Sequence, residues 1–103
     1  MAWLPCASPG ADAHAGHTET SLLLHLSPEC VRLDRARPGN SAPLAELLPA
    51  MRAGGVAAVS AVGVLGDPTT ATAGEGQRIF DEMVDAGLAA IATWAPGPDG
   101  MLR

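Results

Sequence analysis

The sequence predicts a fold that mixes helices and strands, because segments typical of strands lie between segments typical of helices. Residues 73–94 have apolar side chains at the 3.6-residue spacing of an amphipathic helix. Residues 31–34 and 56–60 are short runs typical of a half-buried and a buried strand. With 103 residues, 48% of them hydrophobic, the chain is long enough for one modest domain and too short for two.

The first elements are an irregular lead and a short helix. Residues 1–10 contain two prolines and a glycine, which disfavour regular structure. Residues 19–26 predict a helix, because either Thr18 or Thr20 can act as its N-cap and the leucines that follow form one apolar stripe. Pro28 ends this segment. A strand is the alternative, because so short an apolar run fits either element.

Short elements and turns make up the middle of the chain. Residues 31–34 alternate apolar and polar side chains as a strand does, and a turn follows at residues 38–40. Residues 44–51 have apolar side chains at helical spacing, but Pro49 removes a hydrogen bond, so we expect a helical turn or two at most. After two glycines, residues 56–60 predict a buried strand.

The last helix is the clearest element. The sequence Thr-Ala-Gly-Glu at residues 72–75 matches the capping box that begins a helix. One apolar face then continues to about residue 94, and its members are Ile79, Phe80, Met83, Val84, Leu88 and Ile91. Two prolines and a glycine end the helix and leave residues 96–103 as a polar tail.

Composition excludes some classes of partner. A formal net charge of −5, from 11 acidic and 6 basic residues, disfavours nucleic acid, because binding to phosphates requires clustered Lys and Arg. The chain has neither the apolar stretch of a membrane span nor the basic start of a signal peptide, so we expect a cytoplasmic protein. Cys6 and Cys30 are too few for a disulfide framework, and we expect reduced thiols.

Residues 12–21 contain the candidate site. His14 and Glu19, with Gly16 between them, do not lie one turn apart on a continuous helix, but a loop entering a helix at Thr18 can turn both toward one point. A carboxylate in a first helical turn is favoured by the helix dipole and by free N–H groups, which stabilise its ionised form. The alternative is that Glu19 only complements the dipole and that His14 is a solvated loop residue.

Two further side chains extend this candidate toward a metal site. His17 lies three residues after His14, and Asp12 is an acceptor that can orient an imidazole. The spacing matches none of the standard zinc patterns, so a small metal site made by these residues and Glu19 is a weaker alternative. His25, which lies among leucines, is expected to be a partly buried core residue with one hydrogen bond.

The glycine-rich segment at residues 63–68 is a candidate for phosphate binding. It lacks the Lys-Ser/Thr pair of a phosphate loop and the spacing of a dinucleotide fingerprint. We interpret it as a turn, set by Asp67 and Pro68, that leads to the last helix.

Residues 12–21, Asp-Ala-His-Ala-Gly-His-Thr-Glu-Thr-Ser, resemble the His-Ala-Gly-x-x-Glu-Thr-Ser segment of the creatininase family of metal-dependent amidohydrolases. The resemblance continues through Gly-Val-Leu-Gly-Asp-Pro at residues 63–68 and Ala-Thr-Ala at residues 71–73. It covers nearly the whole chain from about residue 11. Residues 44–49 and 53–56 are most similar to the mycofactocin-system branch, in which a peptidase trims the C-terminus of a ribosomally made cofactor precursor.

The resemblance implies that the chain is the C-terminal part of a three-layer α/β/α sandwich, a single partial domain over residues 1–103. It implies that His14 is the catalytic residue acting on the leaving amine and that Glu19 is a carboxylate at a centre of divalent metal ions, zinc, iron or manganese. The substrate would be a peptide or small amide, and the family allows a homo-oligomer. The Glu-x-His…Asp and Asn-Gly-His motifs that supply most metal ligands are absent from the sequence.

We therefore expect a fragment, or a misplaced start codon, and no activity of the chain alone. An alternative from another class is a non-catalytic binding or assembly module that docks on a partner through exposed apolar surface. In-frame metal-ligand motifs upstream of Met1 would favour the enzyme.

Overall fold

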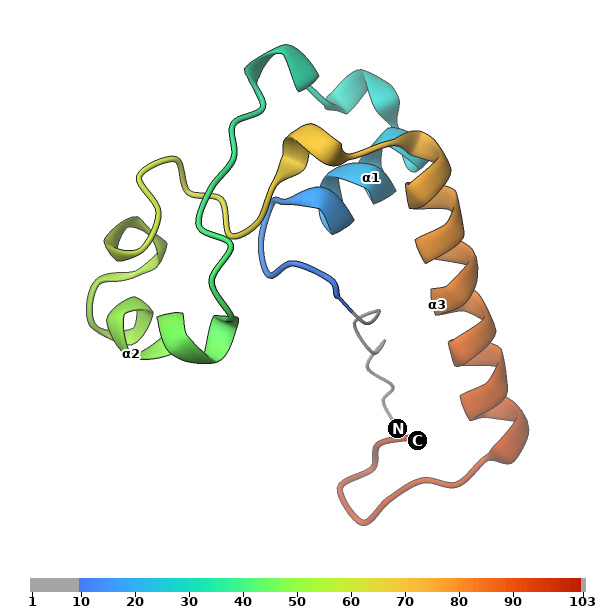
Figure 1. Ribbon diagram of the computed structural model, residues 1–103. Helices are drawn as coiled ribbons and strands as arrows, with labels where there is room; N and C mark the ends of the chain where they lie inside the picture. The colour runs from blue at the N-terminus through green and yellow to red at the C-terminus, as the bar shows by residue number, and fades with distance from the viewer. Residues whose placement is uncertain (1–9, 103) are drawn as a thin grey trace.

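The computed structural model describes residues 10–102. Within this range the α-helices are α1 (His17–Leu26), α2 (Leu44–Gly54) and α3 (Ala73–Thr93). Figure 1 shows α1 lying beside the first half of α3, with α2 on the other side of the molecule. The predicted irregular lead falls almost wholly outside the described residues.

Helix α1 begins two residues earlier than a cap at Thr18 allows and four residues earlier than a cap at Thr20 allows. Its N-cap position is Gly16, and the first turn is capped instead by the carboxylate of Asp12. Asp12 accepts hydrogen bonds from the N–H groups of His17 and Thr18, at 2.5 and 3.0 Å. These donors have no partner within the helix, so a carboxylate from the preceding loop replaces the threonine cap. The end at Leu26 agrees with the prediction, and the strand alternative is wrong.

The two predicted strands do not form. The residues expected to form the first strand run instead into a 3-10 helix, η2 (Leu33–Arg35), and the second segment contains η3 (Val56–Ala58). Among residues 10–102 the only strand-like pairings are isolated bridges between His14 and Leu65 and between Pro96 and Leu102. A strand needs a neighbour for its backbone groups, and short local hydrogen bonds replace that neighbour here. The described part of the chain thus lacks the sheet of an α/β/α sandwich.

Helix α2 is longer than the predicted turn or two, although Pro49 lies inside it. Proline removes one hydrogen bond, but burial of Leu47 on the inner face keeps the helix together. The helix ends where Gly55 takes a positive φ of 71°, and the Gly55 N–H donates to the carbonyl of Met51 at 2.7 Å.

Helix α3 has nearly the predicted bounds. The Thr72 hydroxyl accepts a hydrogen bond from the N–H of Glu75 at 3.1 Å, which is one half of the capping box. The other half does not form, because the N–H of Thr72 donates to the Ser21 hydroxyl at 3.2 Å and Glu75 pairs with Arg78 instead. The capping threonine therefore also joins α3 to α1.

Helices α1 and α3 approach each other closely at Ser21 and Gly76. Ser21 is fully buried, and a Cβ added at Gly76 would lie 1.8 Å from the Ser21 carbonyl oxygen. One turn further on, the rings of His25 and Phe80 lie 5.9 Å apart, and the predicted partial burial of His25 is confirmed. The absence of a side chain at Gly76 allows this contact between the two backbones.

The apolar face of α3 is only partly covered. Ile79 and Ala90 are buried, but most of the large side chains along this helix are exposed. Beyond the contact with α1, the second half of α3 extends without another element beside it (Figure 1). The exposed members are Phe80, Val84, Leu88, Ile91 and Trp94.

Candidate active site

The loop that carries His14 is paired with the glycine-rich segment. Leu65 donates its N–H to the carbonyl of His14 at 2.8 Å, and its own carbonyl accepts from the N–H groups of Ala13 and His14. Leu65 is buried at this junction. The segment at residues 63–68 therefore fixes the loop in place through its backbone. At its end Asp67 caps a short 3-10 helix, η4 (Pro68–Thr70), which leads to α3 where the sequence predicted a turn.

His14 and Glu19 face one another at the start of α1. Their Nδ1 and Oε2 atoms lie 3.9 Å apart, and the two side chains are 55% and 58% exposed. Glu19 Oε2 also accepts a hydrogen bond from the N–H of Ala15 at 2.5 Å. Ala15 has a positive φ of 52°, which makes the sharp bend between the two residues. The structure thus brings the two predicted site residues together, and Glu19 also stabilises the beginning of the helix.

Asp12 has a different role from the one expected of it. Besides the first turn of α1, its carboxylate binds the N–H of Asp67 at 3.2 Å, so it joins the loop, the helix and the glycine-rich segment. Burial raises the pKa of Asp12, but the hydrogen bonds from Thr18, His17 and Asp67 outweigh burial and hold the pKa below its usual value. The carboxylate is an anchor for the backbone rather than a partner for an imidazole.

Two glycines make room for this carboxylate. A Cβ at Gly16 would lie 1.9 Å from Asp12 Oδ2, and a Cβ at Gly66 would lie 2.0 Å from the same atom. Gly66 also has a φ of 140°, which side chains disfavour. Gly16 and Gly66, which lie in the two segments with the family resemblance, therefore both make room for the Asp12 carboxylate.

His17 links α1 to the start of α3. Its Nδ1 atom lies 2.8 Å from the hydroxyl of Thr70, and its Nε2 atom lies 3.5 Å from Glu75 Oε1. The Arg78 guanidinium beside Glu75 lowers the pKa of that carboxyl, and His17 contributes in the same direction. Both ring nitrogens of His17 are therefore engaged with neighbours other than His14.

The described residues do not form a metal centre by themselves. Residues 10–102 contain no group of three or more His, Cys, Asp or Glu side chains that could hold an ion. Asp12 is directed at backbone N–H groups and His17 at Thr70 and Glu75, so the four-residue metal site considered from the sequence does not form.

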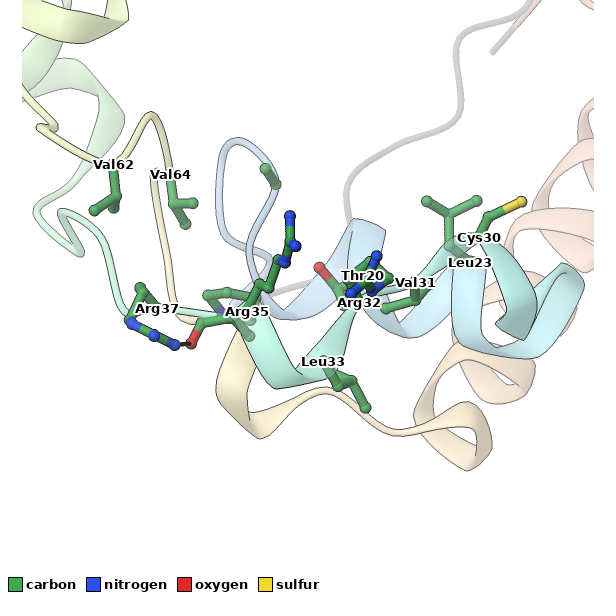
Figure 2. Close-up of a pocket in the computed structure, with 13 residues that line it drawn as sticks. Thr20, Leu23, Cys30, Val31, Arg32, Leu33, Arg35, Arg37, Val62 and Val64 are labelled. Carbon is green, nitrogen blue, oxygen red and sulfur yellow. Dashed lines mark hydrogen bonds between the residues drawn. The ribbon is translucent and has the colours of Figure 1, made fainter.

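A cleft lies next to the loop and α1. Its volume is about 550 Å³. Ala15 and Thr20, the chain neighbours of His14 and Glu19, belong to its wall. Figure 2 shows Arg35 and Arg32 between Val62 and Val64 at one end and Leu23 and Cys30 at the other, with Arg37 toward the end of the two valines. Sequence reasoning missed this cleft, although one signal was present: three of the six basic residues fall within residues 32–37.

The structure also bears on membrane spans and on the cysteine thiols. No helix among residues 10–102 is long and apolar enough to cross a membrane. Cys30 is an exposed free thiol, and Cys6 lies outside the described residues.

Comparisons with known proteins confirm the predicted family resemblance. The creatininase family, described as creatinine amidohydrolase, matches residues 2–91. A mycofactocin precursor peptide peptidase of Mycobacterium ulcerans (strain Agy99) is 71% identical over 100 residues. The proteins of the same name from Mycobacterium tuberculosis (strain H37Rv) and Mycolicibacterium smegmatis are 68% and 63% identical. Each match covers 97% of this chain and 40% of the relative, so the chain spans less than half the length of these relatives.

A solved structure is also similar. The crystal structure of a Bacteroides fragilis protein, provisionally described as a creatinine amidohydrolase, matches with a TM-score of 0.57 and 33% identity. The match covers 75% of this chain and 33% of that one. The fold of about three quarters of this chain therefore recurs within a longer protein.

Proposed function

This chain belongs to the creatininase family, and on that premise we propose that it is the C-terminal part of a metal-dependent hydrolase that trims a mycofactocin precursor peptide. The observation that carries the proposal is the 71% identity over 97% of the chain to a peptidase of that name. Its reaction would cleave an amide bond of a peptide, in the cytoplasm. The described residues lack a metal centre of their own, so we propose that the chain is inactive alone.

We assign the proton transfer to His14. Its side chain is 55% exposed, and the loop that carries it lies next to the cleft, so a substrate can reach it. The Glu19 carboxylate lies on the Nδ1 side of the ring, which directs the other nitrogen, Nε2, away from Glu19. An imidazole held in this way can donate a proton to the leaving amine when the amide bond breaks. His14 would therefore act as general acid in this proposal.

Glu19 is the residue we propose as this chain's ligand to the metal ions. A carboxylate beside a histidine suits a divalent ion, but these two side chains supply too few donors to hold one. The remaining ligands would come from the part of the family fold that precedes the matched segment. A divalent ion bound there would activate a water molecule for hydrolysis. In this proposal, no step of the hydrolysis uses a metal ion held by residues 10–102 alone.

The exposed face of α3 supports the proposal that this chain is one part of a longer fold. Phe80, Met83, Val84, Leu88 and Ile91 line an apolar groove of about 380 Å³. More than half of each relative's length lies outside the match, so a large piece of the family fold is available to cover this groove. We propose that this piece supplies the neighbouring sheet of the three-layer α/β/α sandwich.

The same face also favours the second candidate function, a non-catalytic assembly module. An apolar helix face of this kind is typical of a protein–protein contact. Such a module would bind a partner through α3 and would not need His14 or Glu19. The two functions therefore differ in whether association of the missing part produces hydrolysis.

Complementation distinguishes them. The 103-residue chain is co-expressed with the part of the Mycobacterium ulcerans relative that precedes the matched segment, and hydrolysis of a mycofactocin precursor peptide is followed by mass spectrometry. The enzyme proposal predicts cleavage that requires both pieces and stops when a chelator removes divalent metal. A stable complex without cleavage would favour the assembly module.

A further inference from the structure

The cleft beside α1 concentrates the positive charge of the chain. Arg32, Arg35 and Arg37 line it and make up half of the six basic residues in the sequence. None of the 11 acidic residues belongs to its lining. In a chain with a net charge of −5, this separation of charge creates a local surface that attracts anions while the rest of the chain repels them.

The contacts of these arginines leave most of their positive charge uncompensated. Arg32 Nε lies 3.4 Å from Asp34 Oδ1, and both side chains are more than half exposed, so this pair is weak. Arg37 donates to the neutral carbonyl of Ala36 at 2.9 Å. Of the three guanidinium groups that line the cleft, only that of Arg32 thus has a carboxylate beside it, and this carboxylate does not belong to the lining. Guanidinium groups form two parallel hydrogen bonds with a carboxylate, which makes arginine suited to binding acidic side chains.

Apolar side chains lie at both ends of the arginine cluster. Val62 and Val64 lie at one end and Leu23 lies at the other (Figure 2). A cleft of about 550 Å³ is far larger than a single carboxylate and falls in the size range of ligand sites. This alternation of apolar and basic lining matches an extended peptide that carries both apolar and acidic side chains.

We propose that this cleft binds an acidic segment of the peptide substrate, with its carboxylates on the three arginines. Ala15 and Thr20 connect the cleft wall to His14 and Glu19, so a peptide held there would pass the proposed general acid. The assignment of the peptide as substrate rests on the proposed function. The binding of an acidic peptide by this chain does not depend on it.

Calorimetric titration of the 103-residue chain tests the proposal. The probes are a short synthetic peptide of glutamates interspersed with valines and alanines, and a counterpart in which glutamine replaces every glutamate. We expect the glutamate peptide to bind and the glutamine peptide to bind at least about tenfold more weakly. Raising the salt concentration weakens the first interaction, because solvent-exposed charges are screened.

Substitutions of the arginines test whether the glutamate peptide binds in the cleft. Replacing the three arginines by glutamine, R32Q/R35Q/R37Q, is expected to weaken binding of the glutamate peptide by about tenfold or more. The control is Arg52→Gln, because Arg52 is exposed on α2 and does not line the cleft. Circular dichroism checks that each variant is folded, and the single variant Arg35→Gln replaces the triple variant if that one unfolds.

Three results would overturn the proposal: no binding of the glutamate peptide, equal binding of the two peptides, or undiminished binding by the folded arginine variants. Displacement of the peptide by inorganic phosphate at equal concentration would also overturn it, since the cleft would then be a general anion site. Because binding is measured without hydrolysis, failure here leaves the complementation result untouched, and failure of complementation leaves peptide binding intact.

Discussion

Asp12 accepts hydrogen bonds from the backbones of His17, Thr18 and Asp67, and so connects segments that are 55 residues apart in the sequence. Gly16 and Gly66 leave the space that its carboxylate occupies. The position of His14 and Glu19 beside one another depends on this anchor, because it fixes the loop on one side and the helix on the other. At the scale of single residues, the site is held by a carboxylate that itself takes no part in the proposed chemistry.

Asp12→Ala is expected to lower the free energy of unfolding by about 1–2 kcal/mol, because the first turn of α1 loses its cap. Urea unfolding followed by circular dichroism measures this change. The matched control is Asp81→Ala, at an exposed position within α3. Equal stability of the two variants would contradict the anchoring role.

The pKa of Asp12 also makes stability depend on pH. Its pKa is lower in the folded chain than its usual value, so the folded state binds fewer protons than the unfolded state. The stabilisation is therefore fully present above about pH 4 and is lost as the pH falls below that value, through the folded-state pKa. Urea unfolding of wild type and Asp12→Asn between neutral and acidic pH measures it. We expect the difference in stability between them to shrink in acid, and a constant difference would count against this assignment.

At the scale of the elements, α1 and α3 meet where Gly76 lies against the backbone of Ser21. The sequence predicts α3 well, because its capping threonine and apolar periodicity are local signals. It predicts the end of α1 but not its start, because the cap of that helix comes from Asp12 in the preceding loop. The two strands were predicted wrongly for the opposite reason. Residues 31–34 and 56–60 have the side-chain pattern of strands, but a strand also requires neighbouring chain, which residues 10–102 do not supply.

Gly76→Ala is expected to destabilise the chain by about 1–3 kcal/mol, because the new methyl group would force the two helices apart. Gly74 offers a matched control in the same helix, since a Cβ there meets nothing within 4 Å. Gly74→Ala should leave stability unchanged or raise it by up to about 1 kcal/mol through better helix propensity. Thermal melts of both variants give the comparison, and equal effects would show that the close contact is not needed.

At the scale of the whole molecule, the described chain has a small buried core and a long helix with an exposed apolar face. The sequence motifs alone pointed to the family. The pairing of His14 with Glu19, five residues apart, follows from a bend at Ala15 and a helix start at His17. The anchoring role of Asp12 and the arginine cleft were not predicted. Both depend on contacts between segments far apart in the sequence, such as Asp12 with Asp67, which no local pattern reveals.

Leu88→Lys tests whether the missing part of the fold covers α3. Leu88 is 60% exposed in this chain, so the change should alter its stability little. In the complex of this chain with the co-expressed part of the relative, the same lysine would be buried without a partner. Co-purification of the two pieces should therefore fall sharply. Glu46→Lys, at an exposed position on α2, is the control. Undiminished co-purification of Leu88→Lys would place the interface elsewhere.

The role of His14 is tested by the rate of precursor-peptide hydrolysis in the complex of the two co-expressed pieces. We compare wild type with His14→Ala and expect the variant to be slower by about 10²–10⁴-fold, because the leaving amine loses its proton donor, while the two pieces still co-purify. Equal rates of cleavage with and without the His14 imidazole would show that His14 is not the general acid.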